Sequence, residues 1–329
     1  MAAFGIPSLS LELEATIAQG LGEVETMLNN RIEGKYLFAN ETSRHLVIAG
    51  GKRFRPLITI LGSLIGNGVN ENVIKAAAVC ELTHLATLYH DDVMDEAPLR
   101  RGVESANSRW GNSVAILTGD YLFAKMSQIL AELGPEAVKL QADTFERLVI
   151  GQIQETQGPS ASDDHLQHYL QVVADKTGSL IATSLRFGAM FAGCSKIEID
   201  TLTEFGEKIG IAFQLADDII DIASDTLDSG KTPGTDLREG IPTLVTLNAM
   251  QSNDPNDASL KLALSGPIKS EEKVQWVINE LRNHRAIAQS RTQLQQIAKE
   301  ARAALGPLPI NETSTALFSL CDLVIDRVG

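Results

Sequence analysis

Two acidic clusters with the same spacing are the residues of this sequence best suited to do chemistry. Residues 91–95 read Asp-Asp-Val-Met-Asp and residues 217–221 read Asp-Asp-Ile-Ile-Asp, so each cluster has carboxylates at positions i, i+1 and i+4. On an α-helix, side chains at i and i+4 lie one turn apart on the same face. Carboxylate oxygens suit Mg²⁺, which keeps several waters and takes further ligands from substrate phosphates. The repeat therefore predicts a phosphate substrate held between two helices through magnesium.

Basic residues near the first cluster supply groups that can bind phosphate. Arg100 and Arg101 follow it after a turn at Pro98, and a guanidinium can donate two parallel hydrogen bonds to one phosphate. Residues 50–56 (Gly-Gly-Lys-Arg-Phe-Arg-Pro) form another basic cluster at a glycine turn, without the Ser or Thr that follows the lysine of a P-loop. The structural alternatives are a surface ion-pair network for the arginines and a flexible loop for the glycine turn.

Three further positions extend this pattern of charged and polar groups. An ideal helix places Asp91 and Asp95 each within about twenty degrees of His84, because seven and eleven residues nearly close whole turns. The alternative for His84 is a histidine whose polar atoms are satisfied in the core. Residues 176–178 (Lys-Thr-Gly) lie mid-helix and predict a kink, since Thr and Gly are poor helix formers. Lys231 lies in a predicted mobile loop that can close over bound phosphate.

Composition and charge limit the possible functions. The chain has 329 residues, 44% of them hydrophobic and 21% charged, as is typical of a soluble globular protein. Its formal net charge of −14 argues against binding nucleic acid, which requires a basic face. Cys80, Cys194 and Cys321 are far apart and predict buried thiols in a reducing compartment. Neither a signal peptide nor a transmembrane segment is apparent, so we expect a cytoplasmic protein.

Helical periodicity dominates the chain and alternating strand patterns are scarce. Residues 73–89 are apolar nearly all round, which predicts a helix inside the bundle. If the two acidic clusters meet in space, one large all-α domain over residues 1–329 is favoured over two domains. The predicted helices cover residues 10–32, 42–66, 72–95, 112–132, 135–156, 164–193, 198–226, 241–251, 258–264, 271–288, 290–304 and 313–327.

Taken together, these motifs resemble those of the trans-isoprenyl diphosphate synthases, the polyprenyl synthetase family. The resemblance covers nearly the whole chain and implies a single helical bundle of the isoprenoid synthase type with a central active-site cavity. It also implies a homodimer that elongates an allylic diphosphate, such as farnesyl or geranylgeranyl diphosphate, with isopentenyl diphosphate. The matching motifs occur in family order at residues 50–56, 91–95, 100–102, 176–178, 217–221, 230–231 and 236–240.

Carried over position by position, the resemblance assigns a role to each of these groups. It implies three Mg²⁺ ions, two bound by Asp91 and Asp95 and the third by Asp217, with support from Asp92, Asp218 and Asp221. It implies contacts to the allylic diphosphate from Arg100, Lys176, Thr177, Gln214 and Lys231, and contacts to isopentenyl diphosphate from Lys52, Arg55, His84 and Arg101. The sequence departs from the family at Ile241, where a second lysine is common, so one phosphate contact is in doubt.

The product length follows from the residues one turn before the first acidic cluster. Ala86 and Thr87 are small, whereas farnesyl-making relatives usually have a large aromatic residue there. We therefore predict an open tunnel and a long product of heptaprenyl to nonaprenyl size, used as a quinone side chain and released with transient membrane contact. The alternative is geranylgeranyl diphosphate, with the tunnel closed deeper down by Tyr89, Leu122, Phe123 or Met126.

Three other functions compete with this one. A class I terpene cyclase also has a first acidic cluster, but it has no need of an isopentenyl diphosphate site such as Lys52, Arg55 and Arg101 would form. Glu81 and His84 match the E-x-x-H motif of di-iron bundles, but no second copy is present. A non-catalytic subunit of a heteromeric synthase typically loses an acidic motif, and both are intact here.

Overall fold

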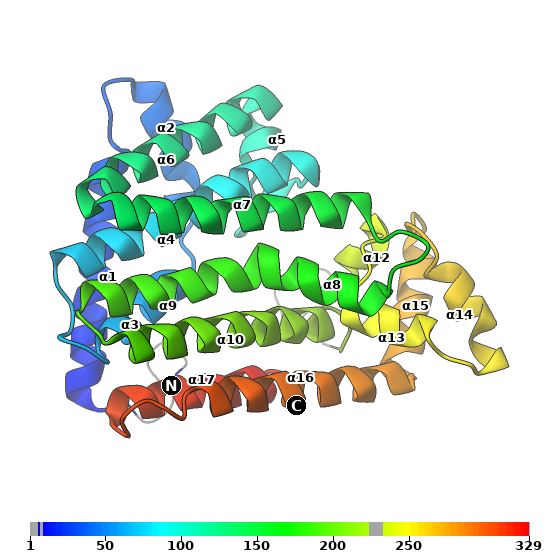
Figure 1. Cartoon of the computed structure of the whole chain (residues 1–329). Helices are drawn as coiled ribbons and strands as arrows, with labels where there is room; N and C mark the ends of the chain where they lie inside the picture. Colours follow the sequence, from blue (N-terminus) through cyan, green and yellow to red (C-terminus); the bar gives the residue numbers. More distant parts are fainter. Residues whose placement is uncertain (1–5, 7–8, 224–232, 329) are drawn as a thin grey trace. The chain divides into compact units, whose positions relative to one another are not determined.

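The computed structural model is all-α, as predicted, over the residues that it describes: residue 6, residues 9–223 and residues 233–328. Within those ranges no helix is long and apolar enough to cross a membrane. Figure 1 shows the α-helices, which are α1 (Leu11–Ile32), α2 (Leu37–Ile48), α3 (Phe54–Ser63), α4 (Glu71–Met94), α5 (Ala106–Trp110), α6 (Asn112–Leu133), α7 (Pro135–Gln157), α8 (His165–Val173), α9 (Ser179–Phe191), α10 (Lys196–Ala223), α12 (Thr235–Glu239), α13 (Leu244–Met250), α14 (Ala258–Ala263), α15 (Glu271–Asn283), α16 (Arg285–Ala304) and α17 (Glu312–Asp326).

The contacts between residues divide the chain into two compact units. The first acidic cluster belongs to the first unit and the second cluster to the second, and the single domain predicted for residues 1–329 stays a prediction. The first unit comprises Met1–Phe145, Leu180–Thr203 and Pro307–Leu317, and the second comprises Glu146–Ser179, Glu204–Gly306 and Phe318–Gly329.

Helix α4 is the interior helix of the first unit, as its uniform apolarity predicts. Its side chains from Val73 to Tyr89 are buried on nearly every face, and α1, α3 and α6 pack against it. Asn70 begins the helix by accepting hydrogen bonds from the backbone N–H groups of Asn72 and Val73. The last turn, with the acidic cluster, therefore projects from a helix that the hydrophobic core holds in place.

Two glycines bring α3 into backbone contact with α9. A Cβ atom at Gly188 would lie 2.0 Å from the carbonyl oxygen of Thr59, and one at Gly62 would lie 2.7 Å from that of Leu185. No side chain fits at either position, so α3 is held against α9 at a short interaxial distance. The loop before α3, which carries the predicted basic cluster, is thus attached to a closely packed helix.

Several predicted helix boundaries are wrong for identifiable reasons. The helix expected over residues 42–66 is two helices, because Gly50 and Gly51 have φ angles of 84° and 145° and end α2. The break expected near residue 289 lies at His284, whose Nδ1 accepts the N–H of Ala286 at the start of α16. The short strands β1 (Leu99–Arg100) and β2 (Val103–Glu104) and helices α5 and α12 were not predicted, since segments of two to five residues show no periodicity.

The segment expected as one helix over residues 164–193, with a kink at residues 176–178, is interrupted at those residues. Between α8 and α9 the chain forms a π-helical turn, η2 (Ala174–Gly178). Such turns insert one extra residue into an α-helix and are frequent at functional sites. Another short turn, the 3-10 helix η3 (Pro255–Asp257), begins with Pro255 and leads into α14.

Candidate active site

The first acidic cluster lies at the C-terminal end of α4. Asp91 is partly buried in the last turn, and Asp95 is exposed at the C-cap, one residue beyond the helix. Carboxylates at this end oppose the helix dipole, so a bound cation would stabilise them. The end of the helix, rather than its face, therefore presents these two carboxylates.

Asp92, between them, has a different environment. It is fully buried, and its Oδ1 accepts a hydrogen bond of 2.5 Å from Nε of Arg100. Its Oδ2 is buried with no hydrogen-bond partner among the described residues. Burial raises the pKa of Asp92, and the nearby Arg100 opposes that rise. Asp92 therefore fixes Arg100 and keeps one oxygen available to a cation or water.

The hairpin of β1 and β2 presents the two arginines. Arg101 and Gly102 form its turn with φ angles of 55° and 78°, as a two-residue type I′ turn requires. Nη1 of Arg101 donates to the carbonyl oxygens of Leu46, at 2.8 Å, and of Gly50. The turn thus directs adjacent arginines to different partners, Arg100 to the acidic cluster and Arg101 to the loop before α3.

The predicted isopentenyl diphosphate residues lie in the first unit, where cations surround His84. Lys52 is exposed, and Nε of Arg55 is buried with no hydrogen-bond partner in the described part of the chain. Burial lowers the pKa of Arg55. Burial also lowers the pKa of His84 well below its usual value, and the charges of Arg55, Arg101, Arg100 and Arg53 lower it further. His84 is therefore neutral at pH 7 and leaves the cationic role to the arginines.

The second acidic cluster lies near the end of α10 in the second unit. Oδ1 of Asp217 accepts a hydrogen bond of 2.5 Å from Nη2 of Arg327, a residue that the sequence analysis missed because it belongs to no motif. Oδ2 of Asp221 accepts from the backbone N–H of Gly234 at 3.1 Å. The guanidinium of Arg327 therefore supplies the positive charge beside Asp217 in this structure.

Asp218 has the same place in its cluster as Asp92 in the first. It is buried, and its carboxylate accepts hydrogen bonds from the hydroxyl of Tyr169 and, at 3.0 Å, from Nε2 of Gln214. Burial raises the pKa of Asp218 to about 6. Gln214 also accepts a 3.3 Å hydrogen bond from Thr177, so the acidic cluster is connected to the π turn.

The π turn positions the lysine and threonine of residues 176–178. Nζ of Lys176 lies 2.5 Å from Oε2 of Glu155, and Oδ1 of Asp175 accepts from Nε of Arg147 at 2.9 Å. A Cβ atom at Gly151 would lie 2.8 Å from the backbone nitrogen of Lys176, so α7 packs directly on the turn. Lys231, the last predicted lysine, lies outside the described residues.

The positions predicted to set product length are closely packed. Ala86 is fully buried, whereas Thr87 keeps some exposure and donates from Oγ1 to the carbonyl of His84 at 2.9 Å. A Cβ atom at Gly119 would lie 3.1 Å from the carbonyl oxygen of Ala86, so α6 crosses α4 at this level. The hydroxyl of Tyr89 donates to the carbonyl of Thr42 at 2.6 Å, which fixes its ring against α2.

The donor set fits magnesium that arrives with a phosphate substrate. Within the described ranges no three His, Cys, Asp or Glu side chains lie together as a ready metal site. Magnesium is usually bound by one or two carboxylates, and substrate phosphates and waters complete its shell. Paired carboxylates beside the unpartnered oxygen of Asp92 meet that requirement.

Comparison with known proteins gives close matches along the whole chain. A model of the polyprenyl synthetase family matches residues 38–281. Nonaprenyl diphosphate synthase of Mycobacterium tuberculosis is 45% identical over 316 residues, covering 96% of this chain and 94% of the relative. A dimethylallyltranstransferase of the same organism is 37% identical over 324 residues, covering 97% and 98%. The crystal structure of geranylgeranyl pyrophosphate synthase from Corynebacterium glutamicum, complexed with calcium and isoprenyl diphosphate, matches with a TM-score of 0.88 and 43% identity, covering 98% of this chain and 99% of that chain. This similarity confirms the helical fold that the motifs imply.

Replacing His84 should change how stability depends on pH. Because its folded pKa lies below the unfolded value of about 6.5, the unfolded chain binds a proton first as pH falls. The free energy of unfolding of the wild-type protein should therefore fall by roughly 1.4 kcal/mol per pH unit below pH 6.5 because of this group. In His84→Gln this contribution should be absent. Urea unfolding at pH 7.5 and pH 5.0 measures the difference. His165→Gln, at an exposed position, is the control; equal slopes in all three proteins would contradict a neutral His84.

Proposed function

Because this chain belongs to the polyprenyl synthetase family, we propose that it condenses isopentenyl diphosphate with an allylic diphosphate to make a long trans-polyprenyl diphosphate. The chain is a prenyltransferase. The observation that carries the product class is the 45% identity to a nonaprenyl diphosphate synthase over 96% of this chain. We propose a product of heptaprenyl to nonaprenyl size, farnesyl or geranylgeranyl diphosphate as primer, and use as a quinone side chain, as in menaquinone. Release of such an apolar product implies transient contact with a membrane.

The allylic diphosphate is the electrophile in this proposal. Its C1–O bond breaks to leave an allylic cation and a diphosphate that gains negative charge. Three magnesium ions, held by Asp91, Asp95 and Asp217, would offset that charge when bound. Arg100, with Lys176 and Thr177, Gln214 and Lys231, would bind the same leaving group, so that positive charge meets the charge that develops.

Isopentenyl diphosphate is the nucleophile, and its diphosphate would bind Lys52, Arg55, His84 and Arg101. The exposed Lys52 and the unpartnered Nε of Arg55 support this assignment. A diphosphate fixed there would hold the homoallyl double bond near the cation, which is a task of positioning. Loss of a proton to the released diphosphate then completes the new double bond.

A second candidate product is geranylgeranyl diphosphate. It is favoured by the 43% identity to the Corynebacterium glutamicum geranylgeranyl pyrophosphate synthase. An enzyme that makes the longer product would differ from one that makes geranylgeranyl diphosphate only in the depth of its hydrocarbon tunnel. Ionisation and coupling are the same for each added isoprene unit. Product analysis therefore decides between them.

We expect the purified chain to extend farnesyl diphosphate with radiolabelled isopentenyl diphosphate and Mg²⁺ to products of seven to nine isoprene units. A dominant geranylgeranyl product would refute the long-chain proposal. Excess chelator should abolish turnover, and Asp91→Asn or Asp217→Asn should lower it by about 10²-fold to 10³-fold, because each removes charge that supports the leaving group. Asp143→Asn, which changes an exposed ion pair with Lys139, is the control.

Omitting isopentenyl diphosphate from the same assay separates the competing functions. A synthase should release diphosphate only when both substrates are present. A terpene cyclase would release it from the allylic substrate alone, and a non-catalytic subunit would release none in either case.

Ala86→Phe should shorten the product by several isoprene units, because a ring at this level of α4 would block a tunnel beside it. Product length measured by chromatography tests this expectation. Overpacking alone costs roughly 1–3 kcal/mol, so Ala78→Phe, at another fully buried alanine of α4, controls for lost stability. An unchanged product in a folded Ala86→Phe protein would show that the position does not face the tunnel.

We also propose that the protein is a homodimer. Helix α2 packs on α6, and both leave large apolar side chains exposed, with Leu37 at 82% and Leu117 at 65% exposure. Such a surface is typical of a subunit interface. Light scattering should give the mass of two chains, and Leu37→Asp with Leu117→Asp should give one. Ile310→Asp, at 95% exposure, is the control; a monomeric wild-type protein would overturn the proposal.

A further inference from the structure

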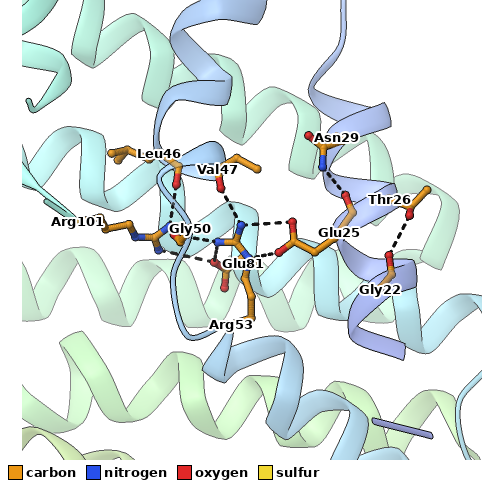
Figure 2. Close-up of polar contacts among 10 residues, drawn as sticks. All are labelled: Gly22, Glu25, Thr26, Asn29, Leu46, Val47, Gly50, Arg53, Glu81 and Arg101. Atoms are coloured by element: carbon orange, nitrogen blue, oxygen red, sulfur yellow. Dashed lines mark hydrogen bonds and ion pairs between the residues drawn. The ribbon is translucent and has the colours of Figure 1, made fainter. Parts of the chain in front are cut away.

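Arg53 lies at the centre of a buried ion network and is assigned no substrate contact (Figure 2). Its Nε and Nη2 donate to the carboxylate of Glu25, and its Nη1 donates to Oε1 of Glu81 at 2.9 Å. Nη2 also donates to the carbonyl oxygen of Val47 at 3.0 Å, and Nη1 to that of Gly50 at 3.4 Å. One guanidinium therefore joins α1, the end of α2, the following loop and α4, all within the first unit.

This arrangement is costly to build, which argues that it does more than fill space. The Arg53 side chain is 9% exposed and the Glu81 side chain 2% exposed, so both charges are removed from water. Arg53 also has left-handed backbone angles, φ 46° and ψ 39°, at the N-cap of α3. Such a conformation costs about 1–3 kcal/mol for a residue other than glycine and persists only where its surroundings impose it.

The network also includes the arginine of the hairpin turn. Arg101 donates to the same Gly50 carbonyl oxygen as Arg53, and its Nη2 lies 3.8 Å from Oε1 of Glu81. A Cβ atom at Gly51 would lie 2.9 Å from Cζ of Arg101, so the guanidinium packs directly against the loop backbone. The Gly50 carbonyl and the Glu81 carboxylate thus set the distance between loop and hairpin.

Two residues proposed to bind a diphosphate flank Arg53 in the sequence, Lys52 in the loop and Arg55 in the first turn of α3. Lys52 precedes it and is exposed, and Arg55 follows two residues later with its Nε unpartnered. The network satisfies the guanidinium of Arg53 with two carboxylates and leaves Lys52 and Arg55 without any ion pair among the described residues. Arg53 holds the loop that carries Lys52 and is itself the N-cap of the helix that carries Arg55, so it influences where both side chains point.

We propose that Arg53, acting with Glu25 and Glu81, is a positioning residue that aligns Lys52, Arg55 and Arg101 on the diphosphate of isopentenyl diphosphate. This inference rests on the proposed function and adds to it the residues that organise one of its two substrate sites. Arg53 touches no substrate itself. It acts by holding one loop geometry, and displacement of a binding group by about 1 Å can cost as much as 10²-fold.

The test compares the two substrates in steady-state kinetics. Arg53→Met should raise KM for isopentenyl diphosphate about 10-fold or more, and change KM for the allylic diphosphate less than about 3-fold. Arg53→Lys keeps the charge but cannot reach both carboxylates. Its KM for isopentenyl diphosphate should therefore lie between those of the wild-type protein and Arg53→Met. Arg31→Met is the matched control, because Arg31 joins α1 to α6 through two hydrogen bonds to Glu132, at 2.6 and 2.8 Å, away from the loop.

A purely structural role for Arg53 gives a different result. Arg53→Met would then lower the melting temperature and affect both KM values equally, as expected of Arg31→Met, and this outcome overturns the inference. If Arg53→Met does not fold, Glu25→Ala carries the test, since the Glu25 side chain is 40% exposed and its loss is tolerable. The same bias toward isopentenyl diphosphate is expected there, and equal effects on both substrates overturn the proposal.

Failure of the proposed function is separable from failure of this inference. If the wild-type chain turns over no isopentenyl diphosphate, the proposed function fails. Calorimetric titration of isopentenyl diphosphate then still decides the role of Arg53. Wild-type binding at least 10-fold tighter than that of Arg53→Met supports the inference, and equal affinity overturns it.

Discussion

Buried charge requires a partner, and this requirement shapes the acidic cluster of each unit. In each acidic cluster the middle carboxylate is buried and bonded by the protein itself, Asp92 by Arg100 and Asp218 by Tyr169 and Gln214. Burial of an ionised group without such bonds would destabilise the folded protein by several kcal/mol. The outer carboxylates are less buried, at the end of α4 and near the end of α10. The repeated motif therefore has one buried acid, bonded by the protein, and two less buried acids in each cluster.

The same constraint explains why the basic residues differ although their side chains are alike. Arg53 donates to two carboxylates and two carbonyl oxygens of the first unit, and Arg101 donates through Nη1 to two carbonyl oxygens. In contrast, Arg55 has an unpartnered Nε and Lys52 is exposed. Burial, and after it the charges of the surrounding arginines, lower the pKa of His84 and keep that imidazole neutral. An acidic chain with a net charge of −14 thus holds a local region of positive charge, which an anionic substrate requires.

Much of the fold was predictable because its signals are local. The periodicity of α4, the break at the π turn and the absence of long strands follow from neighbouring residues. The helix expected over residues 42–66 overlapped the glycine turn expected at residues 50–56, and the structure shows that the turn prevails and ends α2. The partners Glu25 and Arg327 were missed as well, since each acts across the chain and belongs to no motif. Glu81 was noted only for its spacing to His84, which does not reveal its ion pair with Arg53.

The amino-acid order alone was sufficient for the helical class, the two acidic motifs and the family, because each depends on residue type at a short, fixed spacing. The tertiary structure decided which acid of each motif is buried. It also decided that the guanidinium of Arg53 is paired with carboxylates and that Nε of Arg55 has no partner among the described residues. Those properties depend on burial and on groups brought together from distant positions, such as Arg53 and Glu81, which are 28 positions apart. No local pattern encodes them, because the energy of a charge depends on its solvent exposure and on its neighbours in three dimensions.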